Sequence, residues 1–310
     1  MSNLNLQRVE TFFGEATHVS ARVYARLPAD VMEAAAVPAD TELGGSLYGP
    51  FCDRARTLPA RVPLVDLRGD DPRAGGLLAS ASVPDPCFWS PKLPFWYRAT
   101  IELRRGGKVL AESQRLFGIR PLAARGRDLM LAGRRLVVRG AAAERVESHD
   151  LDGWYDATAA MLVDEPGDER CEAASRRGVL LVARLRESAG METRLLRLAR
   201  WPAVGIVVLP TGVTLAEGAC RRVPNLLLAE EPIAGQPPRL SPWAQLAVVQ
   251  AANLEHGTAG KLGVPVFAVR SSEPGEKYAT PADARTACDR LQRDLASQGD
   301  FAGYIVECIV

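Results

Sequence analysis

The stretch that decides the fold is residues 85–140, DPCFWSPKLPFWYRATIELRRGGKVLAESQRLFGIRPLAARGRDLMLAGRRLVVRG. Aromatic and proline residues crowd its beginning: Phe88, Trp89, Pro91, Pro94, Trp96 and Tyr97. Residues 97–103 alternate apolar and polar side chains, and residues 109–117 follow as a second strand. Gly106 and Gly107 between them suit a tight turn, because glycine adopts positive φ angles without steric cost. The stretch therefore predicts a β-hairpin that follows an aromatic cluster.

Short strands also dominate the residues before this hairpin. Runs with alternating polarity occur at residues 19–27, 64–67 and 77–83, and segments rich in proline and glycine separate them. Strands joined by turns, without helical periodicity between them, are typical of a β-sandwich. We therefore expect residues 1–120 to form a sandwich domain.

From about Arg135 onward, short apolar runs alternate with amphipathic segments. The eight runs are residues 136–139, 160–164, 179–185, 204–209, 226–229, 246–250, 264–269 and 301–306. The helices expected between them are residues 150–159, 168–177, 192–199, 215–222 and 281–298. Thr280 followed by Pro281 favours the start of the last helix, as an N-cap residue and a proline at the first helical position. Eight strands in this rhythm predict a (β/α)8 barrel, the TIM barrel, over residues 121–310.

This barrel is expected to be compact and to lack its last helix. Such barrels usually take roughly 200 to 400 residues, and no helical segment follows the eighth run. We therefore expect the sandwich, the N-terminal segment or another subunit to cover the strand that the eighth helix would cover.

The junction between the two domains resembles that of the family-two glycoside hydrolases, the β-galactosidase, β-glucuronidase and β-mannosidase group. The resemblance rests on the aromatic and proline cluster, on Phe117-Gly118-Ile119-Arg120 at the end of the hairpin, and on Arg139-Gly140 at the first barrel strand. It implies an immunoglobulin-like sandwich followed by a (β/α)8 barrel. It also implies where the two catalytic carboxylates of a retaining glycosidase would stand.

Those positions hold other residues in this sequence. By the resemblance, the acid/base glutamate should end the fourth barrel strand, where the chain has Thr211-Gly212. The nucleophile should end the seventh strand, where the chain has Arg270. Residues 141–143, which follow Arg139-Gly140, are alanines in place of the usual asparagine and histidine. The sequence therefore predicts a glycosidase fold that is not catalytic.

The resemblance also places Arg139 opposite Arg270, and two buried cations need acidic partners. The carboxylates at strand ends are Asp164, Glu165, Glu230, Glu231 and Glu307. Three interpretations stay open: a salt-bridge network that fills an empty site, a small-ligand pocket with anion-binding arginines, and relocated catalysis by Glu231 with Glu273. The ligand-binding candidates are Arg139, Glu165, Arg186, Glu231 and Arg270.

Composition argues against several other classes. A formal net charge of +1 provides no attraction for nucleic acid or an anionic membrane. No apolar run reaches the roughly 20 residues that span a bilayer, and the first residues lack the pattern of a signal peptide. Six cysteines without regular spacing indicate reduced thiols, so we expect a cytoplasmic protein. No metal-ligand spacing, P-loop or dinucleotide motif occurs, so we expect neither a metal nor a cofactor.

The sequence thus predicts a glycoside hydrolase-like protein that acts as a carbohydrate-binding or protein-interaction scaffold. Its partners would be a carbohydrate or a protein, with self-association as a further expectation. Of the five tryptophans, Trp89, Trp96 and Trp201 are assigned to the core, while Trp154 and Trp243 remain candidates for stacking on sugar rings. The alternative is an active glycosidase with relocated carboxylates.

Overall fold

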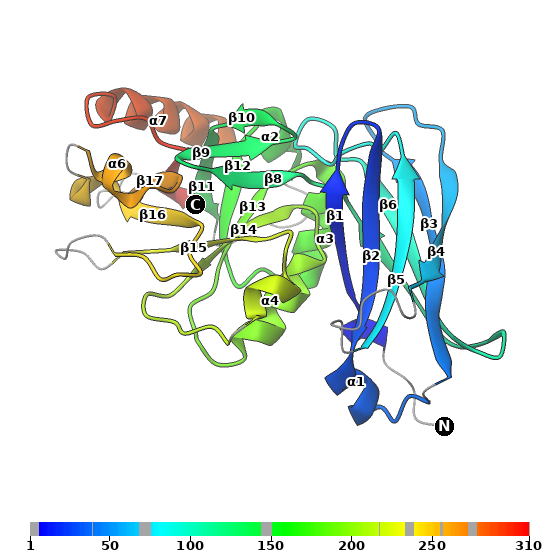
Figure 1. Cartoon of the computed structure of the whole chain (residues 1–310). Coiled ribbons are helices and arrows are strands. Elements are labelled where there is room, and N and C mark those ends of the chain that lie inside the picture. Colours follow the sequence, from blue (N-terminus) through cyan, green and yellow to red (C-terminus); the bar gives the residue numbers. More distant parts are fainter. Residues whose placement is uncertain are drawn as a thin grey trace. The chain divides into compact units, whose positions relative to one another are not determined.

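The computed structural model describes residues 6–38, 40–67, 76–143, 151–216, 218–232, 239–254, 257–271 and 278–309. The chain divides into two compact units (Figure 1). The first contains the residues up to Trp89 together with Phe95–Ile119. The second contains Ser90–Pro94 and the chain from Arg120 onward.

Seven antiparallel strands build the first unit as an immunoglobulin-like sandwich. They are β1 (Glu10–Ala16), β2 (Ser20–Pro28), β3 (Thr41–Phe51), β4 (Ala60–Asp66), β5 (Gly76–Pro84), β6 (Trp96–Arg105) and β7 (Lys108–Phe117). The hydrogen-bonded order is β1-β2-β5-β4-β3-β6-β7. A 3₁₀ turn, η1 (Leu6–Arg8), and a short helix, α1 (Ala29–Ala34), complete the unit. Gly106 and Gly107 join β6 to β7 with positive φ angles, as the sequence predicts.

Strand β4 passes from one layer of the sandwich to the other. Residues 60–64 pair with β3, whereas Val65 and Asp66 pair with Ser80 and Ala79 of β5. Because β4 contacts β5 through only its last two residues, the two strands diverge toward Ala60. The sandwich is therefore open along this edge.

The interior of the sandwich is aliphatic, and the aromatic cluster closes one end. Leu43, Ile101 and Leu103 are completely buried between the layers. Trp89 is also completely buried, and its backbone N–H donates to the Ile119 carbonyl at 2.7 Å. The prediction that Trp89 belongs to the core is confirmed.

The second unit begins with a small antiparallel sheet that the sequence analysis did not predict. Its strands are β8 (Leu122–Arg125), β9 (Asp128–Leu131) and β10 (Arg134–Leu136). They are too short and too rich in charge to give a clear alternating pattern. Arg120, just ahead of β8, is buried and donates to the carbonyls of Pro202 and, at 2.7 Å, Asn225. Both carbonyls precede barrel strands, so this segment lies at the N-terminal end of the barrel.

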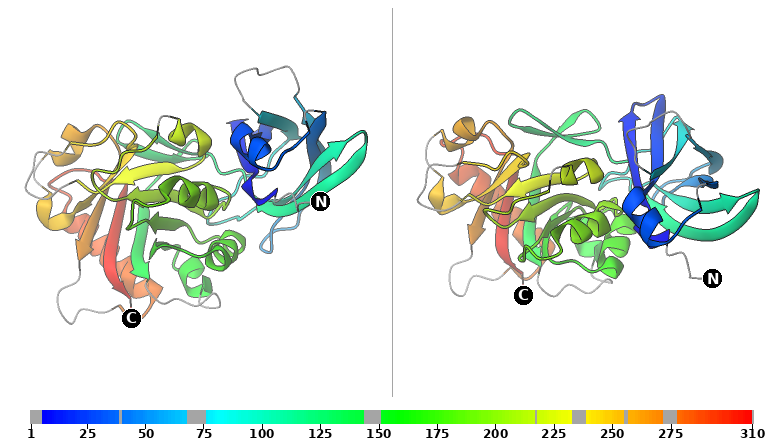
Figure 2. Two further views of the ribbon diagram at one scale, coloured as in Figure 1. Left: turned by 90° about the horizontal axis from the view of Figure 1, so that it is seen from below. Right: turned by 60° about the horizontal axis from the view of Figure 1, so that its bottom comes forward.

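Eight parallel strands then form a closed barrel. They are β11 (Val138–Ala143), β12 (Ala160–Asp164), β13 (Leu181–Arg184), β14 (Val204–Leu209), β15 (Leu227–Glu230), β16 (Leu246–Gln250), β17 (Val266–Ser271) and β18 (Gly303–Ile309). The first and last strands pair, so β18, red in Figure 2, lies beside green β11. The predicted (β/α)8 barrel is confirmed, with β12, β14 and β16 at the predicted residues.

The first barrel strand lies further along the chain than expected. The sequence predicts residues 136–139, but β11 includes the three alanines that follow Gly140. Gly140 passes so close to β12 that a Cβ atom there would lie 2.5 Å from the Ala160 carbonyl oxygen. Small residues are therefore part of the strand packing, and Ala141 and Ala143 are buried within it.

The helices on the outside of the barrel are mostly short. They are α2 (Leu151–Asp156), α3 (Asp168–Arg177), α4 (Met191–Ala199), α5 (Ala219–Arg222), η3 (Ala251–Asn253), α6 (Thr258–Leu262) and α7 (Pro281–Asp294). Thr280 caps α7, and its hydroxyl accepts the Asp283 backbone N–H at 3.1 Å. α7 ends at Asp294 instead of residue 298, and α6 was not predicted.

α7 packs against both β11 and β18. The Cys288 thiol, on this helix, donates to the Gly140 carbonyl at 3.2 Å. The strand β18, which no helix follows among the residues described, is therefore covered by α7, the helix that follows β17.

Of the helices in the described part of the chain, none is long and apolar enough to cross a membrane.

Candidate functional site at the barrel mouth

Charged side chains gather at the C-terminal end of the barrel, which we call the mouth. Asp164 ends β12, Arg184 ends β13, Glu231 directly follows β15, and Glu307 lies near the end of β18. Parallel strands place all their carboxyl ends on one side, which is where (β/α)8 enzymes hold their active sites. The fold therefore brings together four residues that are far apart in the sequence.

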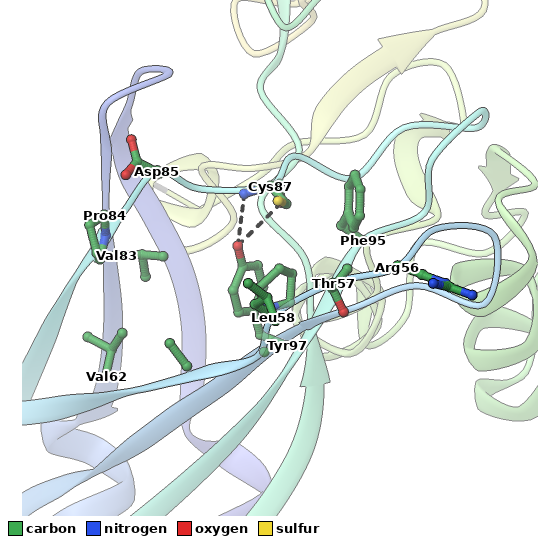
Figure 3. Close-up of a pocket in the computed structure, with 13 residues that line it drawn as sticks. Arg56, Thr57, Leu58, Val62, Val83, Pro84, Asp85, Cys87, Phe95 and Tyr97 are labelled. Atoms are coloured by element: carbon green, nitrogen blue, oxygen red, sulfur yellow. Dashed lines mark hydrogen bonds between the residues drawn. The ribbon is translucent and has the colours of Figure 1, made fainter.

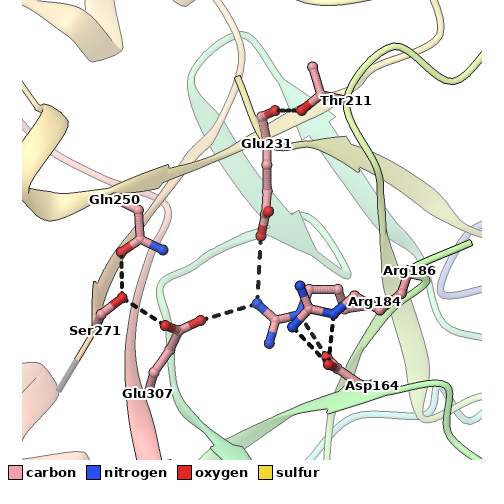
Figure 4. Close-up of polar contacts among 8 residues, drawn as sticks. All are labelled: Asp164, Arg184, Arg186, Thr211, Glu231, Gln250, Ser271 and Glu307. Atoms are coloured by element: carbon pink, nitrogen blue, oxygen red, sulfur yellow. Dashed lines mark hydrogen bonds and ion pairs between the residues drawn. The ribbon is translucent and has the colours of Figure 1, made fainter. Parts of the chain in front are cut away.

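Arg184 is the centre of this group (Figure 4). Its side chain is only 12% exposed, and its Nε lies 2.7 Å from Asp164 Oδ1. Its Nη1 lies 3.1 Å from Glu307 Oε1 and 3.7 Å from Glu231 Oε1. One guanidinium thus forms ion pairs with three carboxylates that lie at the ends of three different strands.

The pKa values in this group are shifted in different directions. Burial disfavours the Asp164 carboxylate, but hydrogen bonds from Arg184 and Arg186 outweigh burial and lower its pKa below 3.8. Burial likewise opposes the charge on Arg184, yet Asp164 and Glu307 raise its pKa. Glu231 lies furthest from the arginine, and burial raises its pKa above 4.5 despite the attraction of Arg184. Glu231 is therefore the carboxylate that the mouth stabilises least.

Neutral polar groups extend the network around the mouth. Ser271 Oγ lies 2.8 Å from Glu307 Oε2 and 3.0 Å from Gln250 Oε1. The Thr211 hydroxyl donates to the Glu231 backbone carbonyl. The turn after β14, together with β16 and β17, thus contributes hydroxyl and amide groups beside the charged side chains.

Arg139 and Arg270 do not face each other in the mouth, contrary to the expectation. Arg139 Nε lies 2.7 Å from Asp289 Oδ1, and the same guanidinium donates to Gln292. Arg270 Nη2 lies 2.6 Å from Asp294 Oδ2. All three partners belong to α7, so both arginines point to the outside of the barrel wall. The alternation of strand side chains places them outside, since neighbours in a strand face opposite sides.

The other predicted residues that the structure describes differ in their exposure. Glu165 accepts from Arg194 at 2.7 Å and from the Arg186 backbone N–H at 3.1 Å. The exposed Arg186 side chain pairs with Asp164 at 2.8 Å. Glu230 is buried, and both carboxylate oxygens accept hydrogen bonds from Ser241. Glu273 lies outside the described residues.

The residue that sequence reasoning missed is Arg184. The sequence predicts a strand over residues 179–185 and Arg186 as a binding candidate, whereas β13 ends at Arg184. A charged residue inside the buried run LLVARL was the available signal. An arginine at such a position needs acidic partners, because an unpaired buried charge is costly.

No group of three or more metal-binding side chains occurs among the residues that the structure describes.

The two tryptophans that remain candidates for stacking on sugar rings differ in burial. Trp154 is buried in the core. Trp243 is partly exposed on the segment after β15, and its indole N–H donates to the Val213 carbonyl after β14 at 2.9 Å. Of the two, Trp243 therefore remains the candidate for a ring contact near the mouth.

Comparison with known proteins gives one family model that matches part of the chain. The sequence model described as "Glycosyl hydrolases family 2" matches residues 57–120, which include β6, β7 and the aromatic cluster. No curated protein matches the chain. The predicted resemblance to family-two glycoside hydrolases is confirmed for this part of the sequence.

Solved structures extend the likeness to both units at the level of the fold. A β-glucuronidase from Ruminococcus gnavus in its apo form matches with a TM-score of 0.64 and 11% identity, covering 96% of this chain and 60% of that one. The Bifidobacterium dentium β-glucuronidase matches with a TM-score of 0.63 and 11% identity, covering 96% and 59%. A β-glycosidase from Bacteroides vulgatus gives 0.60 and 13%, covering 86% and 38%.

The chain thus spans between 38% and 60% of the length of these three structures. At such low identity the likeness concerns the fold, and the local sequence match concerns residues 57–120. Together they relate this chain to glycoside hydrolase family 2, with a sandwich and a (β/α)8 barrel in the order found in that family.

Proposed function

We propose that this glycoside hydrolase-like protein binds a neutral carbohydrate at the barrel mouth without hydrolysing it. The observation that carries the proposal is Arg184, whose guanidinium lies between Asp164, Glu231 and Glu307. A protein partner in place of a carbohydrate is the other form of the same scaffold role.

Hydrolysis needs two carboxylates with separate tasks. A retaining glycosidase uses one as nucleophile and one as acid/base, about 5 to 5.5 Å apart. Here Arg184 holds Asp164 and Glu307 at ion-pair distance, which withdraws their charge from any attack on a sugar. At the positions that the family resemblance assigns to catalysis stand Thr211, whose hydroxyl cannot serve as the general acid, and Arg270, which pairs with Asp294.

The charges of the mouth favour a neutral sugar over an acidic one. In the described part of the mouth, Asp164, Glu231 and Glu307 face Arg184 and Arg186, so carboxylates exceed arginines by one. Carboxylates accept hydrogen bonds from sugar hydroxyls, and guanidinium groups donate to them. A uronate would add a further negative charge beside Glu231, which is already disfavoured as an anion.

Calorimetric titration with methyl glycosides tests this proposal. We expect neutral methyl β-glycosides to bind more tightly than methyl β-glucuronide, and Glu307→Gln to weaken the binding. Arg270→Gln is the matched control, since Arg270 ends a barrel strand but contacts α7, and it should leave the affinity unchanged. Stronger binding of the glucuronide, or equal effects of the two substitutions, would contradict the proposed site.

One observation favours hydrolysis as a second candidate. Burial raises the pKa of Glu231, as a general acid requires. Glu307, the possible second carboxylate, lies beside the same Arg184 nitrogen, Nη1, as Glu231. Incubation with aryl α- and β-glycosides tests this, alongside Glu231→Gln, Glu307→Gln and Glu273→Gln. We expect no turnover above that of the three variants. Turnover that disappears in Glu231→Gln would replace the binding role with catalysis.

The scaffold form of the proposal is tested by association in solution. Light scattering over a range of protein concentrations measures whether copies of the chain associate. A stable oligomer, together with absence of sugar binding, would favour the protein-interaction role.

A further inference from the structure

The first unit contains a cavity of about 850 Å³ at the edge where β4 leaves β5 (Figure 3). Val62 of β4 and Val83 of β5 both line it, and these strands pair only further along, at Val65 and Asp66. The divergence of the two layers therefore creates the space. Its volume falls within the roughly 300 to 1,000 Å³ of typical small-molecule sites.

The inner wall of the cavity is apolar because its main polar group is already satisfied. The Tyr97 hydroxyl accepts the Cys87 backbone N–H at 3.0 Å and points back to the Cys87 carbonyl at 3.5 Å. Burial raises the pKa of Tyr97 to about 12, so the hydroxyl keeps its proton at neutral pH. Apart from Thr57 and Cys87, what remains on this wall is aliphatic and aromatic surface, including Phe95.

The rim of the cavity carries features that point to a ligand. The Leu58 side chain is 93% exposed, although it lines the opening. Arg56 also lines the rim, and it has no ion-pair partner among the residues that the structure describes. Asp85, at a φ of 42°, lies on the opposite side of the cavity from Arg56 (Figure 3).

We propose that this cavity binds a small aromatic monocarboxylate, with its ring against the apolar wall and its carboxylate at Arg56. The apolar wall suits a ring, and the exposed guanidinium, which has no ion-pair partner in the described chain, suits one anionic group. Asp85 on the far side disfavours a second anionic group at that end. Leu58 then covers the ring and loses its exposure to water.

This site is independent of the barrel mouth, because every residue that lines it belongs to the first unit. A failure of carbohydrate binding at the mouth would therefore not contradict the proposal for the cavity. The mouth variants Glu307→Gln and Arg270→Gln should bind the monocarboxylate as the unmodified protein does.

Calorimetric titration of the full chain with three naphthalene probes tests the proposal. The probes are 1-naphthoate, 1-naphthylmethanol and 1-naphthylmethylammonium, which share a ring and differ in charge. We expect the order of affinity to be naphthoate, then alcohol, then ammonium. Arg56→Gln should weaken naphthoate binding about fivefold, as the loss of one partly exposed ion pair implies, and leave the alcohol unchanged.

Two further variants locate the site. Val62→Phe places a ring inside the cavity and should weaken all three probes at least about tenfold, because the added ring covers apolar wall that a probe would otherwise bury. Leu58→Ser should weaken all three by a few-fold, whereas Leu110→Ser removes an exposed leucine from β7 and should change none. Thermal unfolding checks that each variant is folded.

The proposal is overturned if naphthoate does not bind at millimolar concentration, or if it binds no better than the ammonium probe. Unchanged affinity in folded Val62→Phe would also overturn it. If Val62→Phe does not fold, Arg56→Gln and Leu58→Ser decide, because both replace exposed side chains.

Discussion

The barrel mouth and the sandwich cavity differ in whether their charged side chains form ion pairs. In the mouth, Arg184 is 12% exposed and pairs with three carboxylates, so the charged groups satisfy one another. At the cavity, Arg56 and Asp85 stand at the rim without ion-pair partners in the described chain, and the walls are apolar. A ligand in the mouth must fit around existing ion pairs, whereas a ligand in the cavity would meet mostly apolar walls.

The difference follows from how the strands are arranged. A closed ring of parallel strands brings the residues at their carboxyl ends within reach of one another, where desolvated charges need partners. In the sandwich, β4 pairs with β3 over five residues but with β5 over two, so the layers separate instead of converging. Convergence therefore favours a polar network, and divergence leaves an apolar opening.

Arg184→Met should produce the largest effect, because it removes the one cation that the three mouth carboxylates share. We expect a loss of about 3 kcal/mol in the free energy of unfolding at neutral pH, the cost of leaving partly buried charges unpaired. The loss should shrink as the pH falls and the carboxylates become protonated. Urea unfolding at several pH values measures both quantities.

Arg186→Met is the matched control for that substitution. Arg186 also pairs with Asp164, but its side chain is 55% exposed, so we expect a loss below about 1 kcal/mol. Equal losses in the two variants would show that Arg184 is not the centre of the network.

Tyr97→Phe should produce an intermediate effect at the sandwich cavity. It removes the hydroxyl that pairs with the Cys87 backbone, and we expect a loss of about 1 to 2 kcal/mol because a partly buried N–H loses its acceptor. Tyr48→Phe is the control in the same unit, since its ring is partly exposed on β3. Thermal and urea unfolding of both variants should show a clear loss only for Tyr97→Phe.

The sequence predicted the fold because its periodicity was strong. Apolar runs such as residues 160–164 and 204–209 are buried on both sides and became β12 and β14 without adjustment. The aromatic cluster and the glycine turn identified the β6–β7 hairpin in the same way. The β8–β10 sheet escaped prediction because its strands span only three or four residues and expose arginines to solvent.

The site was harder to predict because it depends on which side each strand end faces. A shift of one residue turns a side chain from the inside of the barrel to the outside. Arg139 and Arg270 lie at strand positions that face α7, whereas Arg184 faces the mouth, and the sequence does not distinguish these sides within fully apolar runs. The carboxylates were easier, since Asp164, Glu231 and Glu307 all follow or end predicted strands.

The two smallest effects should differ from each other, because Arg184 stabilises its carboxylate partners unequally. The folded-state pKa of Asp164 is lowered, so Asp164 adds stability above its unfolded pKa, and this stability is lost as pH falls through the folded value. The pKa of Glu231 is raised, so its contribution is present at low pH and is lost as pH rises through the folded value.

Asp164→Asn should therefore lower the free energy of unfolding at pH 7 by up to about 1 kcal/mol, whereas Glu231→Gln should leave it unchanged or raise it by about 0.3 kcal/mol. Below pH 4 the Asp164→Asn loss should diminish, since protonation removes the same charge from the unmodified protein. NMR titration of the carboxyl groups should give a pKa below 3.8 for Asp164 and a pKa above 4.5 for Glu231. If both substitutions destabilise equally at pH 7, Arg184 binds Glu231 as strongly as Asp164. The mouth would then have no weakly held carboxylate, and the case for Glu231 as a general acid would be lost.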